Sequence, residues 1–151
     1  KECAKHFFAK WNDVMQRMAP ESGGLKNLIQ TTCDFLGADS QLINELYGVK
    51  TQTGQYRLIF DIINYCPECM EYMNVFNEKY FDTLFTLVQE AKAIGEVRED
   101  IEPESLYFML SSLMEGSNIV KITDPGLNIE EYTQKTFNII WNGIKAKEDD
   151  Q

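Results

Sequence analysis

The chain has 151 residues, 44% of them hydrophobic, and this is enough apolar sequence for one domain with a sizeable core. Its 14 basic and 24 acidic residues give a formal net charge of -10, so the chain by itself is not expected to bind a nucleic acid backbone. No apolar run approaches the roughly 20 residues that span a bilayer, and no secretory signal opens the sequence, so we expect a soluble protein.

Apolar residues recur with a period near 3.6 along almost the whole chain, which predicts an all-α protein of six or seven helices in one domain over 1–151. The first helix is expected to end before Pro20. The second runs from Leu25 to Gly37, and a short third helix ends at Gly48. The segment "QYRLIFDIINY" is apolar on more than one face and is expected to lie centrally.

Three longer helices are predicted in the second half of the chain. Pro67 suits the first turn of a long helix that ends at Gly95, and Pro103 opens the next one. The turn "TDPG" precedes the last helix, for which Asn128 and Glu131 resemble a capping box.

The same period predicts which side chains share one face on three of these helices. On the second helix they are Leu25, Leu28, Ile29, Thr32, Cys33 and Leu36. On the long helix they are Met70, Met73, Phe76, Tyr80, Leu84, Leu87, Ala91 and Ile94. On the helix after Pro103 they are Leu106, Met109, Leu110, Leu113 and Val120, and either this side or the side with Tyr107, Phe108 and Met114 could face the subunit's own core.

The segments "GEVREDIEPESLYFMLSSLMEG" and "FNIIWNGI" resemble the C-terminal half of the TetR family of bacterial transcription regulators. The positions that carry the resemblance are Gly95, Val97, Arg98, Asp100, Ile101, Glu102, Gly116, Ile139, Ile140 and Gly143. The order of the preceding helices is also similar to the family, so the likeness covers essentially the whole chain. Glu102 differs from the aspartate common in the family and is a weaker helix cap.

The family's N-terminal helix-turn-helix head does not occur here. Residues 1–18 would then be the remainder of the helix that connects head and body, and we interpret the chain as a fragment.

The resemblance implies a homodimer in which helices 104–121 and 129–145 form a four-helix interface with a second subunit. Both helices carry apolar residues on more than one side, as an isologous contact requires. The residues expected at the interface are Tyr107, Phe108, Ser112, Met114, Gly116, Phe137, Ile140, Trp141 and Ile144. The alternative is that these helices are buried within one subunit.

The resemblance also implies a pocket inside the body for a small hydrophobic or amphipathic effector. The candidate ligand contacts are Trp11, Met15, Phe60, Asn64, Tyr65, Tyr80 and Phe81, each of which is alternatively a plain core residue. Effector binding would then alter DNA binding by the missing head, most simply in a repressor.

Other readings of the residues stay open beside this one. Cys66 and Cys69 form a CxxC pair that would suit a thiol sensor or a metal sensor. Cys3, His6 and Cys33 could complete a metal site, but the spacing of these three residues matches no known metal pattern. We interpret the cysteines as structural, in a reducing cytoplasm, and expect no metal and no cofactor. With a single histidine near the first residue, catalysis is not expected. A helical interaction adaptor without a pocket is the main alternative function.

Overall fold

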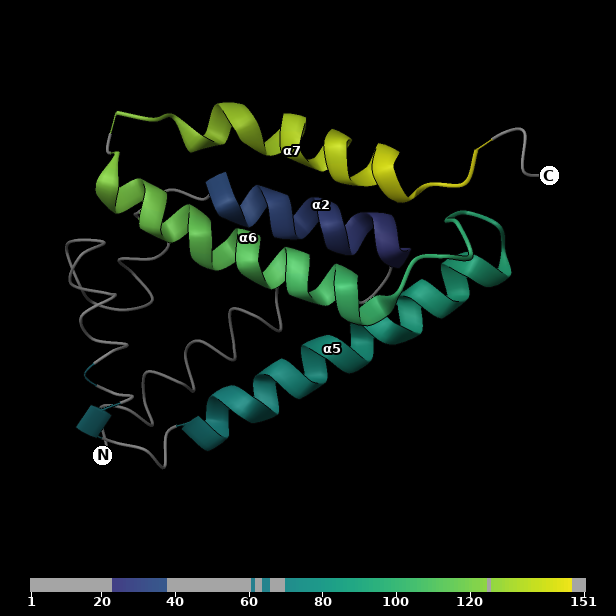
Figure 1. Cartoon of the computed structure of the whole chain (residues 1–151), viewed down its shortest axis with the longest axis horizontal. Helices are drawn as coiled ribbons and strands as arrows, with labels where there is room; N and C mark the ends of the chain where they lie inside the picture. The colour runs from purple at the N-terminus through teal and green to yellow at the C-terminus, as the bar shows by residue number, and fades with distance from the viewer. Residues whose placement is uncertain (1–22, 38–60, 62–63, 66–69, 125, 148–151) are drawn as a thin grey trace.

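The computed structural model of the chain describes residues 23–37, 61, 64–65, 70–124 and 126–147 (Figure 1). The helices in these ranges are α2 (Gly24–Gly37), α5 (Met70–Ala93), α6 (Pro103–Thr123) and α7 (Ile129–Ile144). The described part of the chain contains no strand, only one isolated bridge between Val97 and Lys145, so the predicted all-α class is confirmed there. The helices predicted before Pro20 and before Gly48 lie outside the described residues.

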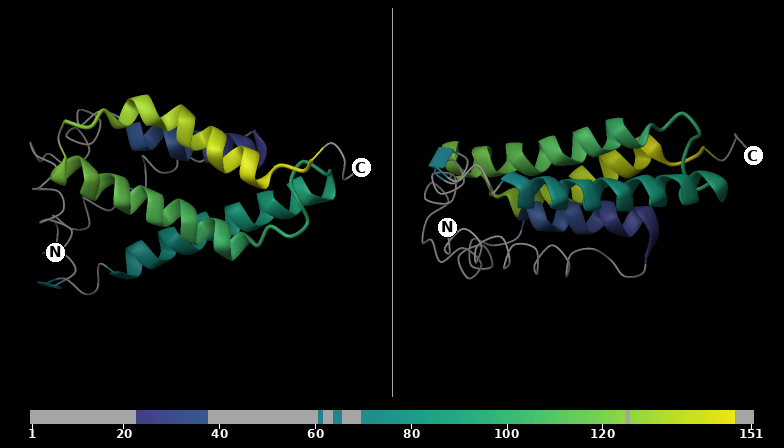
Figure 2. Two further views of the ribbon diagram at one scale, coloured as in Figure 1. Left: turned by 45° about the horizontal axis from the view of Figure 1, so that its top comes forward. Right: turned by 90° about the horizontal axis from the view of Figure 1, so that it is seen from below.

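Helix α2 contacts each of the other three described helices. It packs most extensively along α7 and also contacts α5 and α6, whereas α6 and α7 each touch α2 more than they touch each other. Seen from below, α6 lies on one side of the bundle and α2 on the opposite side, with α5 and α7 between them (Figure 2). This arrangement leaves one side of α6 and α7 without a described helix over it.

The inner face of α2 is as predicted. Residues three and four apart share one face of a helix, and here that face lies against the other helices. All six side chains are buried: Leu25, Leu28, Ile29, Thr32, Cys33 and Leu36. The other helices complete the core with Leu84, Val88, Ala91, Leu106, Leu110, Phe137, Ile140 and Ile144.

Two of the predicted inner faces need correction at their edges. Leu84 and Ala91 are buried on α5, but Ile94 is 77% exposed, because α5 ends at Ala93 and Ile94 belongs to the turn that follows. On α6, Leu106 and Leu110 are buried, whereas Met109 and Val120 are partly exposed because they lie at the edge of this face and not at its centre. The side chains of Met73 and Phe76 lie outside the described part.

Gly95, Pro103 and Asn128 lie at helix ends as the sequence predicts, but the predicted capping bonds of α7 do not form. Gly95 takes a positive φ of 71°, the conformation that ends many helices and that glycine adopts without steric cost. Pro103 is the first residue of α6 and Asn128 is the N-cap of α7, as predicted. The capping box is wrong, because the Asn128 side chain makes no cap bond and the Glu131 carboxylate instead accepts a hydrogen bond from Lys135 one turn later.

None of the helices in the described ranges combines the length and the apolar composition that a bilayer-spanning segment needs.

Candidate functional site: the apolar face of α6 and α7

Helix α6 carries apolar side chains on two opposite faces. One face holds the buried Leu106 and Leu110 against the subunit's own core. The other exposes Phe108, at 73% of its surface, and Ile119, at 53%. The i, i+3 and i+4 spacing places the small residues Ser112 and Gly116 between these two exposed side chains on the same face. We call Phe108, Ser112, Gly116 and Ile119 the α6 strip. The partly exposed Met109 and Val120 lie beside it.

Helix α7 has a matching exposed strip. Ile139 is 75% exposed and Tyr132 is also exposed; Thr136 lies four residues after Tyr132, and Gly143 lies four residues after Ile139. The helix turns its other side, with Phe137, Ile140 and Ile144, into the subunit's own core. We call Tyr132, Thr136, Ile139 and Gly143 the α7 strip.

A groove of about 270 Å³ lies between the two strips, and its wall is almost entirely apolar. Small side chains leave it open on the α6 side, since a Cβ added at Gly116 would meet nothing within 4 Å. The residues that line it are Leu36, Ser112, Leu113, Gly116, Ser117, Val120, Leu127, Ile129, Tyr132, Thr133 and Thr136. Because members of both strips line one groove, the two strips face the same side of the molecule. Together they form the α6–α7 face.

The structure divides the predicted interface residues into two groups. Phe108, Ser112 and Gly116 lie on the α6–α7 face. Phe137, Ile140 and Ile144 do not, and their prediction as interface residues is corrected here, because α7 packs these side chains along α2.

The remaining interface candidates are partly buried. Tyr107 and Trp141 pack against the core, and Met114 is half-buried. Trp141 stacks on Phe137 with ring centroids 6.4 Å apart, and the Lys26 ammonium lies 5.4 Å from the Trp141 ring. Sequence reasoning did not select Tyr132 and Ile119, nor Ile139 as an interface residue, although their spacing relative to Gly143 and Gly116 could have indicated them.

The predicted ligand contacts are also only partly brought together. Trp11, Met15 and Phe60 lie outside the described residues. Asn64 is exposed and Tyr65 is 84% exposed, so the expectation that they face inward is wrong.

Tyr80 and Phe81 do meet, around the ring of Tyr107. The ring centroids of Tyr80 and Tyr107 are 6.0 Å apart, and Phe81 meets Tyr107 edge to face at 5.4 Å. These three rings come from α5 and α6, and we call them the aromatic cluster.

The aromatic cluster has one polar anchor on α2. The Thr32 hydroxyl donates a hydrogen bond of 2.9 Å to the Leu28 carbonyl and lies 3.2 Å from the Tyr80 hydroxyl. Because Thr32 has a single hydroxyl hydrogen, Tyr80 is the donor in the second bond. Burial raises the pKa of Tyr80.

Cys33, beside Thr32 on α2, is fully buried. Burial, and to a smaller extent the nearby Asp34, raises the pKa of its thiol to about 11. The thiol is therefore protonated near neutral pH, and a protonated buried thiol is a poor nucleophile and metal ligand.

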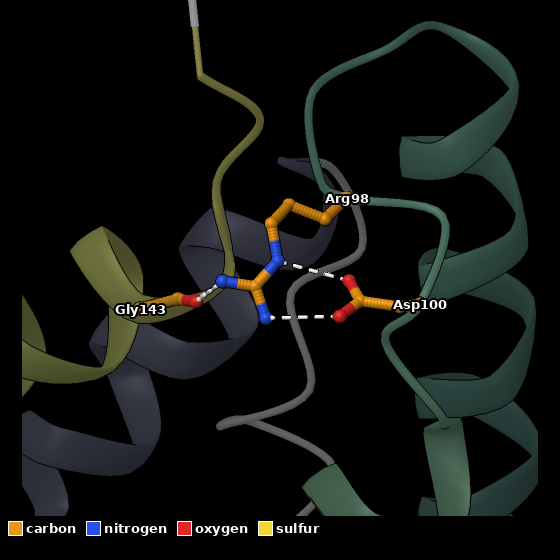
Figure 3. A network of polar contacts seen from close by, with 3 residues as sticks. All are labelled: Arg98, Asp100 and Gly143. Carbon is orange, nitrogen blue, oxygen red and sulfur yellow. Dashed lines mark hydrogen bonds and ion pairs between the residues drawn. The ribbon is translucent and has the colours of Figure 1, made fainter. Parts of the chain in front are cut away.

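The corner between α5 and α6 is tied to the end of α7 (Figure 3). The Arg98 guanidinium donates to both carboxylate oxygens of Asp100, at 2.9 and 3.4 Å, and to the Gly143 carbonyl at 2.6 Å. This contact holds the pKa of Asp100 below its usual value. Two backbone bonds of 3.0 Å lie beside it, from the Arg98 amide to the Ile144 carbonyl and from the Ala146 amide to the Glu96 carbonyl.

Within the described ranges, no group of three or more histidine, cysteine or acidic side chains could hold a metal ion. Cys3, His6, Cys66 and Cys69 are outside those ranges.

The chain matches no family model, no curated protein and no solved structure. The resemblance to the TetR family therefore rests on the sequence motifs, and it stays a prediction.

Proposed function

We propose that this chain is the effector-sensing and dimerisation domain of a TetR-like bacterial transcription regulator, and that it forms a homodimer through the α6–α7 face. The α6–α7 face is the observation that carries the proposal. It exposes Phe108 and Ile139 beside an apolar groove, on helices that also supply the core from their other sides. Exposed large apolar side chains on helices that border an apolar groove are typical of an interaction site.

A second copy of the chain is the partner that this surface suits best. A two-fold dimer needs one patch that complements itself, with each subunit offering both a projection and a recess. The α6–α7 face has both, because Phe108 projects from the helix whose Ser112 and Gly116 border the groove. The small side chains would allow a neighbouring helix to approach closely.

The aromatic cluster supports the effector-sensing part of the proposal. It combines apolar ring surface with one polar pair, the Tyr80 and Thr32 hydroxyls, and this composition suits a small hydrophobic or amphipathic molecule. It lies where α2, α5 and α6 meet. A ligand there that favours one arrangement of these helices would shift the population of body conformations. In the full regulator, the N-terminal head would convert that shift into altered operator binding, as a repressor.

Dimerisation is tested by sedimentation velocity on the wild type and on Phe108→Glu, with Ile94→Glu as the matched control. Ile94 is as exposed as Phe108 but lies in the turn after α5, away from the α6–α7 face. We expect wild type and Ile94→Glu to sediment at twice the 17.5 kDa mass of one chain, and Phe108→Glu to sediment as a monomer with unchanged helical content. A wild-type monomer at high micromolar concentration would contradict the proposal and favour the adaptor.

Effector binding is tested by native mass spectrometry with decanoic acid as a simple amphiphile. Phe81→Ala removes a ring of the aromatic cluster, while Phe85→Ala removes an exposed ring 6.2 Å from Phe81 on the same helix. We expect a saturable one-to-one complex in the wild type and in Phe85→Ala, and its loss in Phe81→Ala. Equal binding by both variants would place the ligand elsewhere.

A further inference from the structure

Helices α6 and α7 are joined at one end by a short turn, closed by the hydrogen bond from the Leu127 amide to the Asp124 carbonyl at 3.1 Å. At the other end, where α6 begins and α7 stops, the two helices are far apart in sequence. The segment between α5 and α6 lies there and reaches the last turn of α7 (Figure 3). The spacing of the two strips therefore depends at this end on what that segment binds.

Arg98 binds the carbonyl groups that α7 cannot satisfy itself. The last four carbonyls of a helix have no partner within the helix. The Arg98 guanidinium binds one of them, that of Gly143, and the Arg98 backbone amide binds another, that of Ile144. A positive charge at this position also interacts favourably with the negative end of the helix dipole. Arg98 thus acts as a C-terminal cap of α7 that comes from a different part of the chain.

Asp100 orients this cap. Its two carboxylate oxygens accept bonds from two guanidinium nitrogens, which fixes the plane of the group and aims the third nitrogen at Gly143. Both side chains are partly or largely exposed, and an exposed ion pair contributes little to stability by itself. The role of the pair therefore lies in geometry more than in stability.

We infer that Arg98 is a positioning residue that fixes the end of α7 relative to the start of α6, and with it the shape of the α6–α7 face. The part of this inference that concerns dimerisation rests on the proposed function. The positioning itself does not, because the bonds of Arg98 lie within one subunit. Replacing Arg98 should thus change the orientation of α7 while leaving α2 and the core folded.

The orientation of α7 relative to α6 can be measured from residual dipolar couplings of backbone amides, together with hydrogen exchange of the Ala146 amide. In Arg98→Met, which keeps the aliphatic stem, we expect a measurable rotation of α7 and at least about tenfold faster exchange at Ala146. Arg98→Lys keeps one charged donor but cannot bridge Asp100 and Gly143 together, so it should fall between wild type and Arg98→Met.

Lys135→Met is the matched control. It also removes a basic partner from an exposed ion pair, at 3.3 Å from Glu131, but this pair lies within α7 and links no second element. Its couplings and its Ala146 exchange should equal those of the wild type. If Arg98→Met also gives wild-type couplings and wild-type exchange, the inference is overturned. Faster exchange at Ala146 without a change in couplings would make Arg98 a cap only, and would equally overturn the positioning role.

The consequence for the dimer is measured separately, as the dissociation constant from sedimentation equilibrium. We expect Arg98→Met to weaken the dimer at least about tenfold and Ile94→Glu, the control away from the α6–α7 face, to leave it unchanged. A dimer of unchanged affinity with a rotated α7 would contradict the link between Arg98 and the α6–α7 face. A monomeric wild type would instead contradict the proposed function, and the couplings would still decide whether Arg98 positions α7.

Discussion

Helices α2 and α6 place their apolar side chains in different ways. The six predicted core residues of α2 are buried on one face. Helix α6 buries Leu106 and Leu110 in the same core but exposes Phe108 and Ile119 on its other side. Two helices that both help to build the core can therefore differ in what remains for interaction outside it. A helix that is apolar all round needs neighbours on all sides, and α6 has them on one side only among the described helices.

The largest expected difference in stability between α2 and α6 comes from truncating one isoleucine on each helix. Ile29→Ala on α2 removes a side chain that is 0% exposed, and we expect a loss of about 2–5 kcal/mol in the free energy of unfolding. Ile119→Ala on α6 removes one that is 53% exposed, and the loss within the subunit should stay below about 0.5 kcal/mol. Urea denaturation at a protein concentration low enough to keep the chain monomeric measures both. Equal losses would mean that the two faces of the molecule are not different in kind.

The next effect is a loss of stability at high pH, and it originates on α2. The folded state raises the pKa of Cys33 from 9.0 to about 11, so the unfolded chain loses this proton first as the pH rises. The stability contributed by the neutral thiol is complete below pH 9. Between pH 9 and 11 it falls by up to about 1.4 kcal/mol per pH unit.

Urea denaturation at several pH values between 8 and 11 would reveal this slope, and Cys33→Ala should make it shallower. The raised pKa of Tyr80 acts in the same direction, so part of the slope should remain in that variant. A Cys33→Ala protein with the wild-type slope would exclude the buried thiol as its source.

A smaller effect is expected at the polar anchor of the aromatic cluster. Thr32→Val keeps the shape of the side chain but removes the hydroxyl that lies 3.2 Å from Tyr80, which should cost about 0.5–1.5 kcal/mol. Thr86→Val on the exposed side of α5 removes a hydroxyl that bonds only to a carbonyl of its own helix, and should change stability by less than about 0.5 kcal/mol. Thermal unfolding of the two variants side by side gives the comparison.

The smallest expected effect is a gain at the start of α6. Glu102 is the N-cap but its side chain makes no cap bond, and its carboxylate instead accepts a bond from the Ser105 hydroxyl at 3.1 Å. The shorter side chain in Glu102→Asp should reach the free amides of the first turn and raise stability by up to about 1 kcal/mol. Glu104→Asp, two residues further along and inside the first turn, should give no such gain. A melting temperature that falls in Glu102→Asp would show that the bond to Ser105 matters more than capping.

The part of the fold that sequence predicts best is α2, because its apolar residues define one face and leave no choice about which side is buried. Gly95, Pro103 and Asn128 also marked helix ends correctly, since the local chemistry of these residues acts within a turn. The prediction was wrong at Ile94, one residue past the end of α5. There the periodicity continued in the sequence after the helix itself had stopped.

The candidate site was harder to predict, for a physical reason. Where a helix has two apolar faces, its period gives their positions but not which one turns toward the subunit's own core. For that reason Phe137 and Ile140 were predicted at the interface and lie in the core, while Ile139 between them lies outside. The bond between Arg98 and Gly143 joins residues 45 positions apart. Spacing alone cannot reveal such a contact, although the family resemblance singled out both residues.

Trp141 gives this protein a built-in optical reporter. Its indole sits on α7, stacked on Phe137 and 5.4 Å from the ammonium of Lys26 on α2, so its emission depends on how closely these two helices approach. The chain has only one other tryptophan, Trp11. A Trp11→Phe variant would therefore report movement between α2 and α7 through fluorescence alone, with no attached dye.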